Sequence, residues 1–347
     1  MTRMIKLSNQ SIIACALGLA LLVSSCTKQV TSNPAPINSV NDSNPPVVVQ
    51  PEINQMIYLT NPTGGNSLKA ILFIPAAAAS VPAVVVMHGS GGLWSSTDST
   101  NTKIASQFKT WIDSFRVHKI AALFIDSYTA RGVKSFPNMA PPANLFLAAE
   151  FVRPPDAYAG LDYLRTLSRI QSGKIALLGF SHGGTSVLST MVDAMAVAKP
   201  VWSVTNYATD STYTDGVLPP AQKPLAGGFA AAVSYYPGAA MFNYYGRPGT
   251  PSDGKYIPYA PVMIHAAGND PLYTTLYTNA DNNTKISAYD GLIQKAQRSP
   301  LSASITKHVY NNANHSFDGV TTTGADGDAN KLAKQRTIDF LKQYLFN

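Results

Sequence analysis

The sequence predicts an α/β fold in which a mostly parallel sheet is covered by helices on both faces. Short apolar runs rich in β-branched residues alternate along the chain with segments of helical spacing. Continuous apolar strands are typical of parallel sheets that are buried on both sides. The expected strands are 68–74, 81–87, 121–125, 174–178, 230–235, 262–266 and 303–310, and the expected helices are 104–117, 155–170, 184–198, 290–297 and 331–345.

The N-terminus has the features of an export signal. Arg3 and Lys6 form a positive segment, and the apolar run 12–23 that follows is too short to span a bilayer. The run ends in Leu22-Val23-Ser24-Ser25-Cys26, which resembles the lipobox of bacterial lipoproteins, where the cysteine receives lipid and becomes the new N-terminus. The alternative is an ordinary secretory signal that ends near a cysteine.

These features divide the chain into three parts. Residues 1–25 are interpreted as a lipoprotein signal peptide, 26–52 as a flexible tether rich in Asn, Pro, Ser and Val, and 53–347 as one globular domain. We expect a cell-envelope protein attached to the membrane by lipid on Cys26. Because Thr27 is not Asp, analogy with enterobacterial sorting favours the outer membrane, facing the periplasm or the cell surface.

Composition excludes several classes of function. The chain has two cysteines, Cys15 and Cys26, so the mature domain holds no disulfide, no thiolate nucleophile and no thiolate metal site. The formal net charge is +7, but the basic residues form no cluster, and nucleic-acid binding is therefore not expected. The apolar fraction of 45% against 13% charged residues is typical of a globular domain.

The most informative stretch is 174–184, in which a buried strand runs into Gly179-Phe180-Ser181-His182-Gly183 and then a helix. A nucleophilic serine needs a tight turn that lifts its hydroxyl off the sheet, and glycines beside it avoid collisions with neighbouring elements. The N-terminus of the following helix supplies N–H groups for a developing oxyanion. We predict Ser181 as the nucleophile; the alternative is a small-residue turn with no chemistry.

A second strand, 81–87, also ends in a glycine-rich turn, 88–92. This turn resembles the oxyanion-hole turn of α/β-hydrolases. One oxyanion donor is expected to be the backbone N–H of Ser90 or Gly91, and the other that of His182, directly after the nucleophile. His88 precedes Ser181 in the chain, whereas the base of this fold follows the nucleophile. We therefore expect His88 to be structural.

The expected acid and base follow two later strands. Asp270 comes just after strand 262–266, where the α/β-hydrolases place the triad acid, although Asn-Asp-Pro is also ordinary turn chemistry. His315 lies on a loop after the last strand, which gives the chain order Ser, Asp, His. Asp281 and Asp290 are weaker choices for the acid. His308 lies inside a strand and is expected to be structural.

Taken together, the chain resembles the dienelactone hydrolase family within the α/β-hydrolases. The stretches that carry this resemblance are 87–92, 126–132, 153–157, 179–184 and 315–318. The resemblance implies an eight-stranded, mostly parallel sheet of the α/β-hydrolase fold. It also implies that Arg153 and Asp156 tie a helix to a loop and that Arg131 borders the pocket. Dienelactone hydrolases use a cysteine nucleophile where this chain has Ser181, which favours a general esterase.

We therefore expect a serine hydrolase that cleaves small carboxylic esters on a Ser-His-Asp triad, with no metal or cofactor. The rivals are an exo-acting serine peptidase and a non-catalytic binding lipoprotein. Segments 201–227 and 238–258 fit the strand–helix alternation poorly and are interpreted as a lid insertion. Its aromatic residues either line a pocket or pack the insertion itself: Tyr207, Tyr213, Tyr235, Tyr236, Tyr244 and Tyr245. No sequence feature indicates an oligomeric state.

Overall fold

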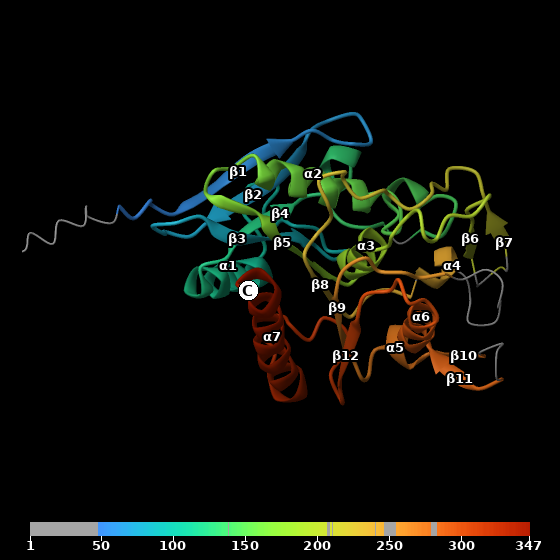
Figure 1. Cartoon of the computed structure of the whole chain (residues 1–347). Helices are drawn as coiled ribbons and strands as arrows, with labels where there is room; N and C mark the ends of the chain where they lie inside the picture. Colours follow the sequence, from blue (N-terminus) through green and yellow to red (C-terminus); the bar gives the residue numbers. More distant parts are fainter. Residues whose placement is uncertain are drawn as a thin grey trace, which may run out of the picture. The chain divides into compact units, whose positions relative to one another are not determined.

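The computed structural model describes residues 48–137, 139–206, 209, 211–239, 241–245, 255–278 and 283–347. These residues form a central eight-stranded sheet in the order β1-β2-β4-β3-β5-β8-β9-β12 (Figure 1). Strands β1 and β2 are antiparallel to their neighbours, and every later pair in the sheet is parallel. The predicted eight-stranded, mostly parallel sheet is therefore confirmed.

The strands of this sheet are β1 (Ile53–Leu59), β2 (Leu68–Ile74), β3 (Val81–Met87), β4 (Ala121–Ile125), β5 (Ile170–Phe180), β8 (Ala232–Tyr235), β9 (Val262–Ala267) and β12 (Ile305–Tyr310). Two small antiparallel pairs lie outside it: β6 (Val204–Asn206) with β7 (Ser211–Tyr213), and β10 (Leu276–Thr278) with β11 (Lys285–Ser287). The helices are α1 (Ser106–His118), α2 (Arg153–Arg165), α3 (His182–Thr190), α4 (Met241–Tyr245), α5 (Pro271–Thr274), α6 (Ala288–Gln297) and α7 (Gly324–Leu345), with short 3-10 turns η1 (Thr129–Arg131) and η2 (Leu145–Leu147).

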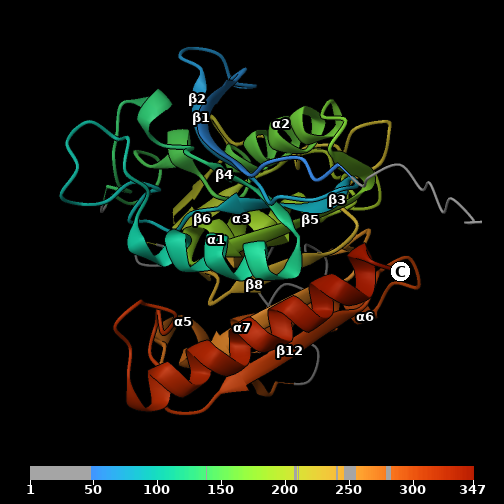
Figure 2. The same ribbon diagram turned by 90° about the vertical axis from the view of Figure 1, so that its left-hand side faces the viewer.

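Helices cover the sheet on both faces, as predicted. Side chains alternate along each strand, so that Val84 and Val86 of β3 face one side and Val85 the other. The side of Val84 packs against α1 and α7, which lie close together in Figure 2. The opposite side packs against α2, α3 and α6. Two apolar cores therefore hold the sheet between two helical layers.

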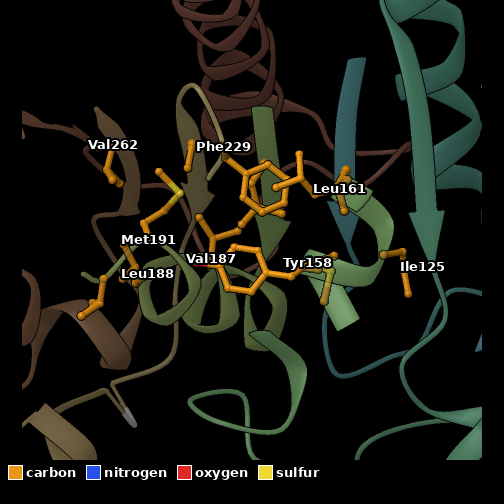
Figure 3. Packing of buried hydrophobic residues seen from close by; sticks show 14 of the residues in the cluster. Ile125, Tyr158, Leu161, Val187, Leu188, Met191, Phe229 and Val262 are labelled. Carbon is orange, nitrogen blue, oxygen red and sulfur yellow. The ribbon is translucent and has the colours of Figure 1, made fainter. Parts of the chain in front are cut away.

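The core under α2 and α3 fixes the helix that begins beside the predicted nucleophile. Figure 3 shows Tyr158 of α2 beside Val187 of α3, and both side chains are buried in the same cluster as Leu161 and Leu188. Tyr158 is also held by a hydrogen bond from its hydroxyl to the carbonyl oxygen of Thr190 at 2.6 Å. The position of α3 is thus set by packing and by a polar contact at its end.

Most predicted elements are found within a few residues of their expected bounds, and two differences have clear causes. The expected helix 184–198 ends at Thr190 because the chain then forms a bridge between Val192 and Pro258, and the N–H of Asp193 donates to Ile257 at 2.8 Å. Strand β1 was not predicted. It is an edge strand with mixed polar and apolar residues, so it lacks the continuous apolar run of the central strands.

The expected insertion contains the β6–β7 pair and helix α4 in its described part. Tyr244 and Tyr245 are buried there, and the Tyr244 ring lies 4.7 Å from that of Trp202. Packing of the insertion is therefore the better interpretation of these two tyrosines. Tyr235 belongs to the central strand β8, and Tyr207 lies outside the described residues. The lid stays a prediction.

The expected signal peptide 1–25, Cys26 and most of the expected tether also lie outside the described residues. Within the part of the chain that the structure describes, no helix combines the length and apolar character needed to cross a bilayer.

Candidate active site

Ser181 lies on the turn between β5 and α3. Its backbone has φ 51° and ψ −115°, a conformation that L-residues rarely adopt and that costs about 1–3 kcal/mol. The turn is held because the N–H of Ser181 donates to the carbonyl oxygen of Tyr235 at 2.9 Å. The N–H of Thr185 then donates to the carbonyl oxygen of Ser181, which starts helix α3. The strain is thus supported by β8 on one side and α3 on the other.

The glycines of this turn allow α3 to approach the sheet closely. A methyl group on Gly183 would collide with the carbonyl oxygens of Met87 and His88 at the end of β3. A methyl group on Gly179 would collide with the carbonyl oxygen of Gly183. Gly89 is also crowded, with the carbonyl oxygen of Phe180 at 3.2 Å from the position of a Cβ. These positions require glycine because neighbouring backbone atoms leave no room for a Cβ atom.

The structure brings Ser181, His315 and Asp270 together. The Oγ of Ser181 lies 2.9 Å from Nε2 of His315, and Nδ1 of His315 lies 2.5 Å from Oδ2 of Asp270. A carboxylate only accepts, so Nδ1 carries the proton and Nε2 is the acceptor that faces the Ser181 hydroxyl. Ser181 and His315 are partly exposed, and Asp270 is buried. The arrangement is suited to removing the hydroxyl proton.

Both partners of the serine follow parallel strands of the same sheet. Asp270 caps helix α5, and its Oδ1 accepts from the N–H of Leu272 at 2.9 Å. The N–H of Asn269 donates to the carbonyl oxygen of Ala313 at 2.9 Å, which ties the loop after β9 to the loop after β12. Because β9 and β12 are paired in parallel, their carboxyl ends meet at one edge and place His315 beside Asp270.

The predicted oxyanion donors lie on two neighbouring segments. His182 is the first residue of α3, and its N–H therefore has no acceptor within the helix. Ser90 and Gly91 form an exposed turn after β3. That turn is closed by a hydrogen bond from the N–H of Gly92 to the carbonyl oxygen of Gly89 at 3.1 Å. Phe136 supports it by donating its N–H to the carbonyl oxygen of Ser90 at 2.8 Å.

Comparison with known proteins agrees with this architecture. Residues 221–345 match the model of the Dienelactone hydrolase family, a range that includes Asp270 and His315 but not Ser181. A search of curated proteins gave no match. Among solved structures, a Klebsiella pneumoniae subsp. pneumoniae MGH 78578 protein designated a candidate dienelactone hydrolase is 15% identical, with a TM-score of 0.52 over 85% of this chain and 100% of its own.

Two further solved structures have similar scores. A dienelactone hydrolase-like promiscuous phosphotriesterase from metagenomic libraries is 14% identical, with a TM-score of 0.50 over 85% of this chain and 99% of its own. A puromycin-hydrolyzing peptidase of Mycobacterium tuberculosis is 16% identical, with a TM-score of 0.51 over 85% of this chain and 39% of its own. At these identities the likeness concerns the fold alone. The chain has the α/β-hydrolase fold.

Sequence reasoning missed one group that packs against His315. The ring of Tyr236 packs edge-on against His315, with ring centres 4.8 Å apart. Its hydroxyl donates to the buried carboxylate of Asp318, which also accepts from Gln107 Nε2 at 2.7 Å. Burial raises the pKa of Asp318, and the two donors oppose that rise. Tyr236 follows a predicted strand, but nothing in its sequence context indicates that it touches His315.

His88 has the surroundings expected of a structural residue. It is fully buried, its Nδ1 bonds the carbonyl oxygen of Gly89 at 2.7 Å, and its Nε2 accepts from the N–H of Ser127 at 3.2 Å. Burial lowers the pKa of His88 to about 3. The ring is therefore neutral and links two loops. His308 is also paired with a neighbouring ring in the sheet, that of His265. No metal-binding group of three or more His, Cys, Asp or Glu occurs among the described residues.

The close approach at Gly183 leads to a prediction about stability. Gly183→Ala forces α3 away from β3, and overpacking of this kind destabilises a domain by about 1–3 kcal/mol. Gly173→Ala is the matched control, because a methyl group on Gly173 meets no atom within 4 Å. Urea unfolding of both variants measures the difference. Equal unfolding midpoints for the two variants would show that α3 has room to move.

Proposed function

We propose that this chain is a serine hydrolase that cleaves carboxylic esters through an acyl-enzyme. The observation that carries the proposal is the hydrogen-bonded series from Ser181 Oγ to His315 Nε2 and from His315 Nδ1 to Asp270. A serine hydroxyl is a weak nucleophile unless a base accepts its proton, and His315 lies at hydrogen-bond distance for this transfer. The proposed enzyme resembles dienelactone hydrolases but uses Ser181 where they use a cysteine nucleophile.

In the proposed mechanism, Ser181 Oγ attacks the ester carbonyl carbon while His315 Nε2 takes the hydroxyl proton. The tetrahedral intermediate collapses, the C–O bond to the leaving alcohol breaks, and His315 returns the proton to that alcohol. Water then attacks the acyl-enzyme by the same route and releases the carboxylic acid and free Ser181. Asp270 holds His315 in the required tautomer and stabilises the imidazolium that forms in both halves.

The negative oxygen of each tetrahedral intermediate requires donors that are already in place. We assign this role to the backbone N–H of His182 together with that of Ser90 or Gly91. The N-terminus of α3 adds positive potential at the same place, because Ser181 precedes the first turn of the helix. Such preorganised donors are worth roughly a hundredfold or more in rate each.

The sequence also supports a proposal about location. We infer that the mature protein is attached to the cell envelope by lipid on Cys26 and that the segment after it tethers the hydrolase domain. The basis is the positively charged start, the short apolar run and the small residues before Cys26. In this interpretation the enzyme acts on small esters at the membrane surface.

Ser181→Ala tests the proposed activity directly. The variant loses the nucleophile, so kcat for p-nitrophenyl acetate, butyrate and octanoate should fall on the order of a millionfold. Ser172→Ala, an exposed serine elsewhere in the domain, should behave as wild type. A fluorophosphonate probe should label wild-type protein and the Ser172 variant but not the Ser181 variant.

The same experiment separates the rival functions. A wild-type protein that cleaves p-nitroanilides of amino acids in preference to all three esters would indicate a peptidase. A wild-type protein that neither turns over substrate nor reacts with the probe would refute the hydrolase and favour a binding lipoprotein.

Cys26→Ser tests the anchor. The full-length wild type should incorporate labelled palmitate in a bacterial host and sediment with membranes. The variant should incorporate none and appear in the soluble fraction after cell lysis. If neither protein incorporated label and both appeared in the soluble fraction, the ordinary secretory signal would be supported instead.

A further inference from the structure

Arg153, the first residue of α2, is fully buried beside the two segments that carry the oxyanion donors. Its Nη1 donates to Nδ1 of His182 at 3.0 Å, and its Nη2 donates to the carbonyl oxygen of His88 at 2.8 Å. One guanidinium therefore joins the start of α3 to the end of β3. These are the places from which the N–H groups of His182 and of the Ser90 turn project.

The contact with His182 fixes the state of its ring. An arginine N–H only donates, so Nδ1 of His182 must accept and Nε2 must carry the proton. Tyr128 adds a second contact, because its hydroxyl lies 2.8 Å from the same Nδ1. Burial and the Arg153 guanidinium lower the pKa of His182 well below its ordinary value. The ring next to the nucleophile is thus a neutral group held from two sides.

The charge of Arg153 is costly where it lies. Among the described residues it forms no ion pair, and its Nε has no hydrogen-bond partner. Asp156 on the same helix acts on Arg153 only through its charge, because its carboxylate is bound by Arg131 through contacts of 2.8 and 2.9 Å. The face of Tyr128, 5.2 Å away, is a weaker partner than a carboxylate. Burying a guanidinium that has no carboxylate at hydrogen-bond distance is expensive.

We propose that Arg153 is a positioning residue that holds both sides of the oxyanion hole at a fixed separation. This inference rests on the proposed function, because it gives a role to a residue of the same site. Arg153 does not touch the reacting atoms. It acts through His182 and the His88 carbonyl, and its positive charge favours the anionic tetrahedral intermediate over the neutral ester. The effect should therefore appear in kcat rather than in KM.

Arg165 provides a matched control on the same helix. Its guanidinium also holds backbone carbonyl oxygens, those of Gly227 at 2.9 Å and Gly228 at 3.3 Å, but these belong to a loop that carries none of the proposed site residues. The experiment compares Arg153→Met, Arg153→Lys, Arg165→Met and Arg165→Lys in the full domain. Active sites are counted with the fluorophosphonate probe, so that kcat refers only to folded enzyme.

We expect Arg153→Met to lower kcat per active site by roughly 10- to 100-fold with KM within about threefold, since a misplaced oxyanion donor weakens only the transition state. Arg153→Lys keeps the charge but cannot reach both partners, so we expect roughly a tenfold loss. The rate of probe labelling should fall in parallel. Both Arg165 variants should keep wild-type kcat per active site.

The outcomes separate this inference from the proposed function. Two results would show that Arg153 is only structural and would leave the proposed hydrolase activity unaffected. One is a wild-type kcat per active site in Arg153→Lys, and the other is an equal loss of kcat in the Arg153 and Arg165 variants. If Arg153→Met does not fold, Arg153→Lys alone decides between these results. A wild-type protein without turnover or labelling would instead refute the hydrolase, and the role of Arg153 with it.

Discussion

The close approach of α3 to β3 governs the geometry of the site. Helix α3 begins where Gly183 lies against the carbonyl oxygens of Met87 and His88, with no room for a side chain. In the tight turn that leads into this contact, Ser181 has a positive-φ conformation. The apolar cores on the two faces of the sheet hold strands and helix in place and so sustain the strain, and Figure 3 shows part of one of them. Local strain is thus supported by packing over the whole domain.

The remaining groups reach the serine because parallel strands end at one edge of the sheet. The loops after β9 and β12 deliver Asp270 and His315, and the turn after β3 delivers the second proposed oxyanion donor. None of these loops is fixed by the sheet alone. Asn269 bonds the loop after β12, Tyr236 packs on His315, and Arg153 joins the turn after β3 to α3. Strand order therefore brings the loops to one edge of the sheet, and these contacts fix the positions of the loops there.

The sequence was informative where chemistry and local structure coincide. Continuous apolar runs predicted the central strands, and the strand–glycine–serine–glycine–helix pattern predicted the place of Ser181, because tight turns need particular residues. It was less informative where a contact depends on distant partners. The end of α3 depends on a bridge to Pro258, the edge strand β1 lacks an apolar run, and Arg153 was expected only to tie a helix to a loop. Tyr236 and Asp318 meet across 82 positions, which no local pattern encodes.

The central claim is that an acyl group passes through Ser181. The most direct measurement is rapid acid quenching of the enzyme during turnover of p-nitrophenyl butyrate, followed by mass spectrometry of its proteolytic peptides. We expect one butyryl group on the peptide that contains Ser181, present within the first turnover and absent from Ser181→Ala. Steady hydrolysis with no acylated peptide, or acylation at another residue, would contradict it.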